Sequence, residues 1–105
     1  MLYFWATWCP ICNLETDSIE SISHDYPVIS IVSWSEGKAE VKAYMLEHRL
    51  TYPVMLDNGG ELAQTFGLKG IPASFILSPS GEIKFVESGY STELGLRLRL
   101  WLSTF

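Results

Sequence analysis

Two cysteines three residues apart are the side chains of this sequence with the clearest potential for chemistry. They form the run Cys9-Pro10-Ile11-Cys12, and the 105-residue chain contains no other cysteine. A pair at this spacing can be a redox-active dithiol, half of a zinc site or a structural disulfide. The residues around the pair decide among these three interpretations.

The zinc and structural interpretations have little support. The only two histidines, His24 and His48, do not follow the cysteines at a zinc-finger spacing. A structural disulfide here would close a four-residue segment and would restrict the unfolded chain very little. Thiol–disulfide exchange is therefore the favoured chemistry, and no metal is expected.

The predicted position of the pair, between a strand and a helix, suits that chemistry. Residues 2–5 are apolar and predict a buried strand, and a helical pattern begins after Cys9. Unpaired N–H groups and the helix dipole at a helix start stabilise a thiolate, so the pKa of Cys9 is expected below the roughly 8.5 of a free cysteine. Pro10 suits the first helical position. Cys12, nearly one turn on, could resolve a mixed disulfide formed by Cys9.

Apolar periodicity and turn residues predict the elements that position this pair. The first helix carries Ile11, Leu14, Ile19 and Ile22 at helical spacing and stops at Pro27. Further helices are predicted at 38–49, with Val41, Met45 and Leu46 inward, and at 61–66. Strands are predicted at 28–34, 52–56, 73–77 and 82–87, the last two forming a hairpin, with chain breaks at 35–37 and 57–60. This order predicts an α/β fold, a mixed sheet with helices on both faces.

The C-terminal segment is ambiguous, because residues 94–102 alternate as a strand would. We favour a helix, for which Ser91 and Thr92 are candidate N-caps. One face of this helix would then collect Leu94, Leu98, Trp101, Leu102 and Phe105. Leu96 and Leu100 would lie on the opposite face, either as scattered surface leucines or as a small contact face for a partner.

Composition bounds the class of protein. The chain is 48% hydrophobic and long enough for one domain, residues 1–105. Twelve acids against seven bases give a net charge of −5, which argues against nucleic acid and anionic membranes as partners. No apolar run approaches the roughly 20 residues of a membrane-spanning helix. A core strand at residue 1 is unusual, so we expect a longer natural N-terminal region that could hold an export signal or tether.

Three segments resemble one known family. Residues 4–12 (FWATWCPIC) resemble the active-site motif of the thioredoxin superfamily, and most closely its TlpA-like and DsbE-like, cytochrome c maturation branch. Residues 67–75 (GLKGIPASF) are similar to the loop that carries a cis-proline opposite the cysteines. Residues 52–57 (YPVMLD) resemble the insert that TlpA-like proteins carry after the second strand. The resemblance covers nearly the whole chain and implies a thioredoxin fold.

The resemblance also implies roles for individual residues. Cys9 would be the attacking thiol and Cys12 the resolving thiol. Pro72 would be the cis-proline, with the backbone of Ile71 pairing with an extended substrate segment. Glu15 matches a glutamate that several TlpA-like reductases keep near their cysteines, and it would accept the proton of Cys12 or tune its pKa; the alternative is a solvated helix residue.

Other residues would form the surface that the substrate meets, or depart from the family pattern. Trp5, Trp8 and Pro10 are expected to border the site together with the loop proline. Tyr3 stands where ordinary thioredoxins carry a buried aspartate, so their proton route is absent here. The pair between the cysteines is Pro-Ile rather than Gly-Pro, and Ala73 replaces the usual threonine after the cis-proline. These departures leave the direction of electron flow open.

The sequence thus predicts a monomeric, extracytoplasmic thiol–disulfide oxidoreductase, in the periplasm or at a membrane anchor outside this segment. It would exchange disulfides with protein substrates, more often as a reductase, and an upstream redox partner would restore its dithiol. No cofactor is implied, because the two thiols carry the electrons. The alternative is a redox-inert thioredoxin-fold module that binds an extended peptide.

Overall fold

The structure is a computed structural model that describes residues 1–34, 37–57 and 59–104. Part of each predicted chain break (residues 35, 36 and 58) and Phe105 of the predicted apolar face lie outside the described residues. The elements in chain order are β1 (Leu2–Trp5), α1 (Pro10–Ser23), β2 (Ile29–Ser33), α2 (Lys38–Glu47), β3 (Val54–Asp57), α3 (Glu61–Thr65), β4 (Ala73–Leu77), β5 (Ile83–Ser88) and α4 (Glu93–Leu102).

The five strands form one mixed sheet in the order β3-β2-β1-β4-β5. β1 is the middle strand, parallel to β2 and antiparallel to β4. β3, formed by the TlpA-like segment, adds a parallel edge strand beside β2, and the β4–β5 hairpin supplies the other edge. Both neighbours of β1 hold it by hydrogen bonds, so the loop that follows it starts from a fixed point.

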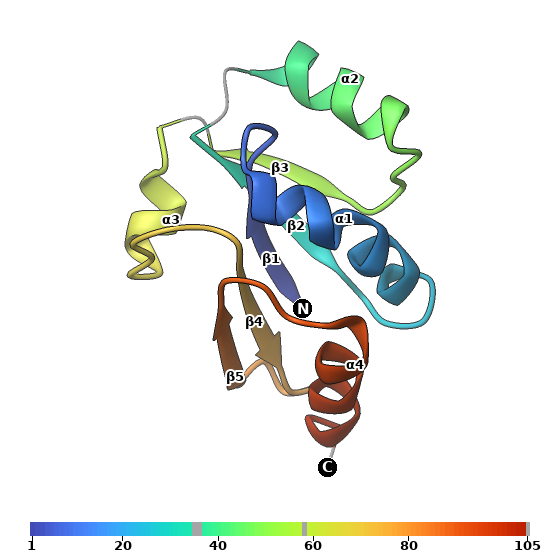
Figure 1. The fold of residues 1–105 in the computed structure, drawn as a ribbon. Helices are drawn as coiled ribbons and strands as arrows, with labels where there is room; N and C mark the ends of the chain where they lie inside the picture. The colour runs from blue at the N-terminus through green and yellow to red at the C-terminus, as the bar shows by residue number, and fades with distance from the viewer. Residues whose placement is uncertain (35–36, 58, 105) are drawn as a thin grey trace.

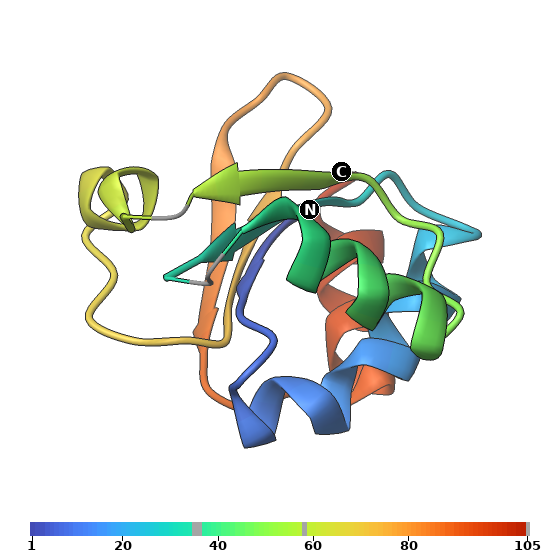
Figure 2. The same ribbon diagram turned by 90° about the horizontal axis from the view of Figure 1, so that it is seen from above.

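Helices cover the two faces of the sheet unequally (Figures 1 and 2). α1, α2 and α4 lie on one face, where Ile19, Val41 and Leu96 pack with Tyr3 and other buried residues of the sheet. The short α3 lies on the other face, over a smaller cluster that includes Phe4 and Phe75. The predicted mixed sheet with helices on both faces is confirmed, and both cysteines belong to the larger cluster.

The predicted orientation of the C-terminal helix is wrong. α4 is capped by Thr92, as expected, but Leu96 and Leu100 are buried in the core. The apolar side chains expected to face inward are exposed; those described are Leu94, Leu98, Trp101 and Leu102. α2 shows a smaller error of the same kind, because Val41 is buried and Leu46 is exposed.

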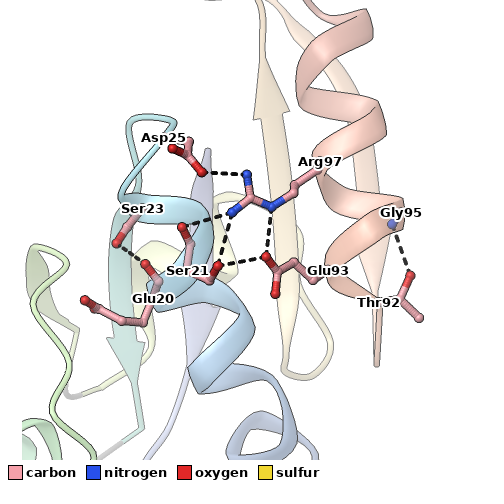
Figure 3. Close-up of polar contacts among 8 residues, drawn as sticks. All are labelled: Glu20, Ser21, Ser23, Asp25, Thr92, Glu93, Gly95 and Arg97. Atoms are coloured by element: carbon pink, nitrogen blue, oxygen red, sulfur yellow. Dashed lines mark hydrogen bonds and ion pairs between the residues drawn. The ribbon is translucent and has the colours of Figure 1, made fainter.

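A polar network explains how α4 is rotated (Figure 3). Arg97 donates from Nε to Glu93 and from Nη1 to Asp25, each at 2.8 Å, and from Nη2 to the carbonyl and hydroxyl oxygens of Ser21 at 3.1 Å. This Arg97 network joins α4 to the end of α1. It turns the Arg97 side of α4, and with it Leu96, toward the core.

Paired truncations test this orientation. Leu96→Ala should lower the free energy of unfolding by about 2–5 kcal/mol, because it opens a cavity in the core. Leu98→Ala, on the exposed side of the same helix, should change it by no more than about 0.5 kcal/mol. Urea unfolding of both variants measures the difference. Equal losses would show that α4 is not docked as described.

Candidate active site

Both cysteines lie at the N-terminus of α1 and are free thiols. Cys9 is the N-cap residue, and its Sγ accepts a hydrogen bond from the N–H of Cys12 at 3.2 Å. Pro10 occupies the first helical turn, where its missing N–H costs no hydrogen bond, and it is exposed. The sequence-based placement of the pair agrees with this geometry.

The two thiols differ in their surroundings. Cys12 is fully buried, whereas Cys9 keeps 4% of its surface exposed. Burial raises the pKa of the Cys12 thiol far above its usual range, and the neighbouring Cys9 and Glu15 add to the rise. Cys12 therefore needs a proton acceptor before it can act as a nucleophile, and Cys9 is the sulfur nearer to the surface.

The loop expected opposite the cysteines is in place. The peptide bond between Ile71 and Pro72 is cis, and the carbonyl oxygen of Ile71 lies 4.0 Å from Cys9 Sγ. Pro72 is buried and Ile71 half-buried. A pocket of about 550 Å³ adjoins the loop on the side of α3 and is lined by residues 66–72 together with Phe75, Val86, Ser88 and Gly89.

Asp57 holds the chain that leads to this loop. Its carboxylate caps α3 by accepting hydrogen bonds from the N–H groups of Leu62 (3.1 Å) and Ala63 (3.0 Å), and it accepts a third from the Ser33 hydroxyl (2.8 Å). Burial raises the pKa of Asp57, but these donors outweigh burial and hold it below its usual range. The end of β3 is thereby fixed to the start of α3, a connection that the sequence analysis assigned only to a turn.

The tryptophans of the motif have different positions. Trp8 is 57% exposed, and its indole N–H donates to the carbonyl oxygen of Trp34 at 2.9 Å. Trp34 has a φ of +57°, which is rare for a residue with a side chain, and its ring packs where a Cβ on Gly60 would lie 2.0 Å from Nε1. Trp5 is fully buried against Tyr44 and so does not border the site, contrary to the expectation. No local sequence signal pointed to Trp34.

Glu15 is a buried residue of α1, not a solvated one. Only 1% of its surface is exposed, and Oε2 accepts a hydrogen bond from the N–H of Ser91 at 3.1 Å. Burial raises the pKa of Glu15 from 4.5 to about 7, although the Ser91 N–H and the Tyr3 hydroxyl lower it part of the way back. A carboxyl that titrates near neutral pH, one helical turn from Cys12, is suited to exchange protons with it.

Two further findings concern a metal site and a membrane-spanning helix. Among residues 1–34, 37–57 and 59–104, no three His, Cys, Asp or Glu side chains gather as a metal site. In the same part of the chain, no helix combines the length and the apolar character needed to span a membrane.

Comparison with known proteins identifies the relatives of this chain. The AhpC/TSA family model matches residues 1–86. Sporulation thiol-disulfide oxidoreductase A of Bacillus subtilis is 30% identical over 99 residues, which cover 88% of this chain and 60% of that protein. Thiol-disulfide oxidoreductase ResA of Oceanobacillus iheyensis is 32% identical over 96 residues, covering 88% and 50%. The chain thus spans only 50–60% of the length of these two relatives.

Solved structures show the same fold. The crystal structure of StoA from Bacillus subtilis superposes with a TM-score of 0.80 at 29% identity, over 96% of this chain and 79% of that one. A thiol:disulfide interchange protein of the thioredoxin family from Chlorobium tepidum gives 0.85 at 26% identity, over 97% and 77%. The family model, the paired cysteines and these superpositions agree: the chain belongs to the AhpC/TSA family and has the fold of the thioredoxin superfamily.

Proposed function

We propose that this chain is a thiol–disulfide oxidoreductase that acts on protein disulfides outside the cytoplasm, in the reducing direction. The observation that carries the proposal is the buried carboxyl of Glu15, one helical turn from Cys12 of the cysteine pair. A thioredoxin-fold module that only bound peptides would gain nothing from this arrangement, since a buried carboxyl lowers stability. The names of the relatives, which include a sporulation thiol-disulfide oxidoreductase, support the same activity.

The reaction proceeds in two exchanges. The Cys9 thiolate attacks one sulfur of a substrate disulfide, which forms a mixed disulfide and releases the other sulfur as a thiolate. Cys12 then gives its proton to Glu15, and its sulfur attacks Cys9 Sγ. The second substrate thiolate leaves and takes up a proton, and Cys9 and Cys12 are left as a disulfide. An upstream dithiol partner must return two electrons to close the cycle.

The loop residues position the substrate. A peptide running past Ile71 can pair with its backbone as an added strand, which brings a disulfide sulfur toward Cys9, 4.0 Å from that carbonyl. Trp8 and Pro10, the neighbours of Cys9 in the chain, are exposed and supply apolar contact surface. The bound partner is therefore an extended or unfolded protein segment, and one copy of the chain holds all the groups used.

The name of a structural relative supports the location. A thioredoxin of Streptococcus pneumoniae at 25% identity is described as an exposed lipoprotein, and it superposes with a TM-score of 0.79. A protein-disulfide reductase outside the cytoplasm needs such an anchor or an export signal.

Cysteine variants test the activity. Cys9→Ser should reduce dithiothreitol-driven insulin reduction to the uncatalysed background, because the attacking sulfur is lost. Cys12→Ser should keep the attack and accumulate mixed disulfides through Cys9, seen as non-reducing gel shifts after incubation with oxidised insulin. If the parent protein shows no more activity than Cys9→Ser, the peptide-binding interpretation replaces the enzyme.

The redox potential of the cysteine pair tests the direction of electron flow. Oxidant proteins of this superfamily owe their high potential to a stabilised reduced form. Here Cys9 Sγ accepts one backbone hydrogen bond, and burial disfavours a thiolate at Cys12. The equilibrium with glutathione should therefore give a potential nearer about −270 mV than −120 mV. A value near the upper figure would assign the protein to oxidation.

Glu15→Gln separates activity from stability. The folded-state pKa of Glu15 is about 7 against 4.5 when unfolded, so its stability contribution is complete below pH 4.5 and is lost as the pH rises through 7. This loss is about 3 kcal/mol. The variant should show no such loss in urea unfolding between pH 4 and 8, yet should reduce insulin roughly a hundredfold more slowly at neutral pH. Unchanged turnover would exclude Glu15 as the proton acceptor.

A further inference from the structure

The core beneath the cysteines contains buried polar atoms without a hydrogen-bond partner. In the described part of the chain these atoms are Tyr3 Oη, Trp5 Nε1, Glu15 Oε1 and Tyr52 Oη. Buried polar groups are nearly always paired, because an unpaired one costs about as much as a lost hydrogen bond. Among these four atoms, the hydroxyl of Tyr3 can donate a hydrogen bond and the carboxyl oxygen Oε1 of Glu15 can accept one.

Tyr3 and Glu15 are buried on two elements that pack together, since Cys12 and Ile19 of the helix that carries Glu15 belong to the same core cluster as Tyr3. Tyr3 is fully buried on β1, the middle strand, where β2 and β4 fix its backbone from both sides. Glu15 is buried on α1, which packs on that face of the sheet. The Tyr3 hydroxyl lowers the pKa of Glu15, yet no hydrogen bond joins the two side chains, because Tyr3 Oη and Glu15 Oε1 both lack a partner.

The titratable groups around Tyr3 show which proton can move. Burial raises the pKa of Tyr3 far above its usual range, and Glu15, Cys12, Tyr52 and Cys9 all add to the rise. Tyr3 therefore keeps its proton throughout and can only donate a hydrogen bond. A neutral carboxyl gains little from such a donor, whereas a carboxylate gains considerably more.

We propose that Tyr3 is a positioning residue of the site, whose hydroxyl donates a hydrogen bond to Oε1 of Glu15 when the carboxyl ionises. This inference rests on the proposed function for its catalytic meaning. The carboxylate then has a fixed donor on each oxygen, Tyr3 on Oε1 and the Ser91 N–H on Oε2. A carboxylate held in this way is ready to accept the proton of Cys12, and the aromatic hydroxyl takes a place that ordinary thioredoxins give to a buried aspartate.

Tyr3→Phe tests the inference, because it removes only the unpaired hydroxyl. Glu15 should lose its donor, and its titration, followed by the ¹³C shift of the side-chain carboxyl, should move upward by roughly one pH unit. At pH 7 the ionised fraction would fall roughly fivefold, and insulin reduction should slow by the same factor. The two rates should converge above about pH 9, where Glu15 is ionised in both proteins.

Tyr52→Phe is the matched control. Tyr52 is also buried with an unpaired hydroxyl, and it packs edge-on against Trp5 in the same core. It is near Cys12, but Glu15 is not among the groups that shift its pKa. Tyr52→Phe should therefore leave the Glu15 titration in place, and adding Tyr3→Phe to Glu15→Gln should leave the pH profile unchanged.

The outcomes are distinct. An unmoved Glu15 titration in Tyr3→Phe, or an equal shift in Tyr52→Phe, would overturn the inference. The ¹³C titration needs no enzymatic activity, so a protein that failed to reduce insulin but still showed the Tyr3-specific shift would refute the proposed function and keep the hydrogen bond.

Discussion

An energetically unfavourable feature lies at the centre of this structure: a carboxyl group is buried in an apolar core. Glu15 lies on the inner face of α1, where burial favours its neutral form and keeps its pKa near neutral pH. The same burial holds the Cys12 thiol protonated. The ionisation of the Glu15 carboxyl and that of the Cys12 thiol are thus linked. Neither group ionises easily, and a proton that leaves one of them can pass to the other.

Two structural features determine where the cysteine pair lies. The middle strand β1 runs directly into the loop that carries Cys9, so the start of α1 is fixed by the best-supported part of the sheet. The cis peptide at Ile71–Pro72 brings a carbonyl oxygen beside Cys9 from 62 residues away in the chain. Cys9 consequently keeps some exposed surface, while Cys12 remains in the core.

Much of this arrangement was predictable from the sequence, and the exceptions share a cause. The strand before Cys9, the helix after it and the β4–β5 hairpin follow from local periodicity and turn residues, and the cis-proline follows from the resemblance. The rotation of α4 was not predictable, because the contacts of Arg97 with Asp25 and Ser21 join α4 to a segment 72 and 76 residues away in the chain. The hydrogen bond from Ser91 to Glu15 was also beyond reach, since nothing local to either residue encodes a contact between them.

That last contact links chemistry to the order of folding. Ser91 and Glu15 are 76 residues apart, and Ser91 lies just before α4, which the Arg97 network ties to α1. A chain in which α4 has not docked lacks the Ser91 N–H that binds Oε2 of Glu15. Because its donor lies 76 residues further along the chain, this contact cannot form until the C-terminal segment has folded back onto α1. The surroundings of Glu15, next to the cysteine pair, are therefore completed only when the C-terminal part of the domain is in place.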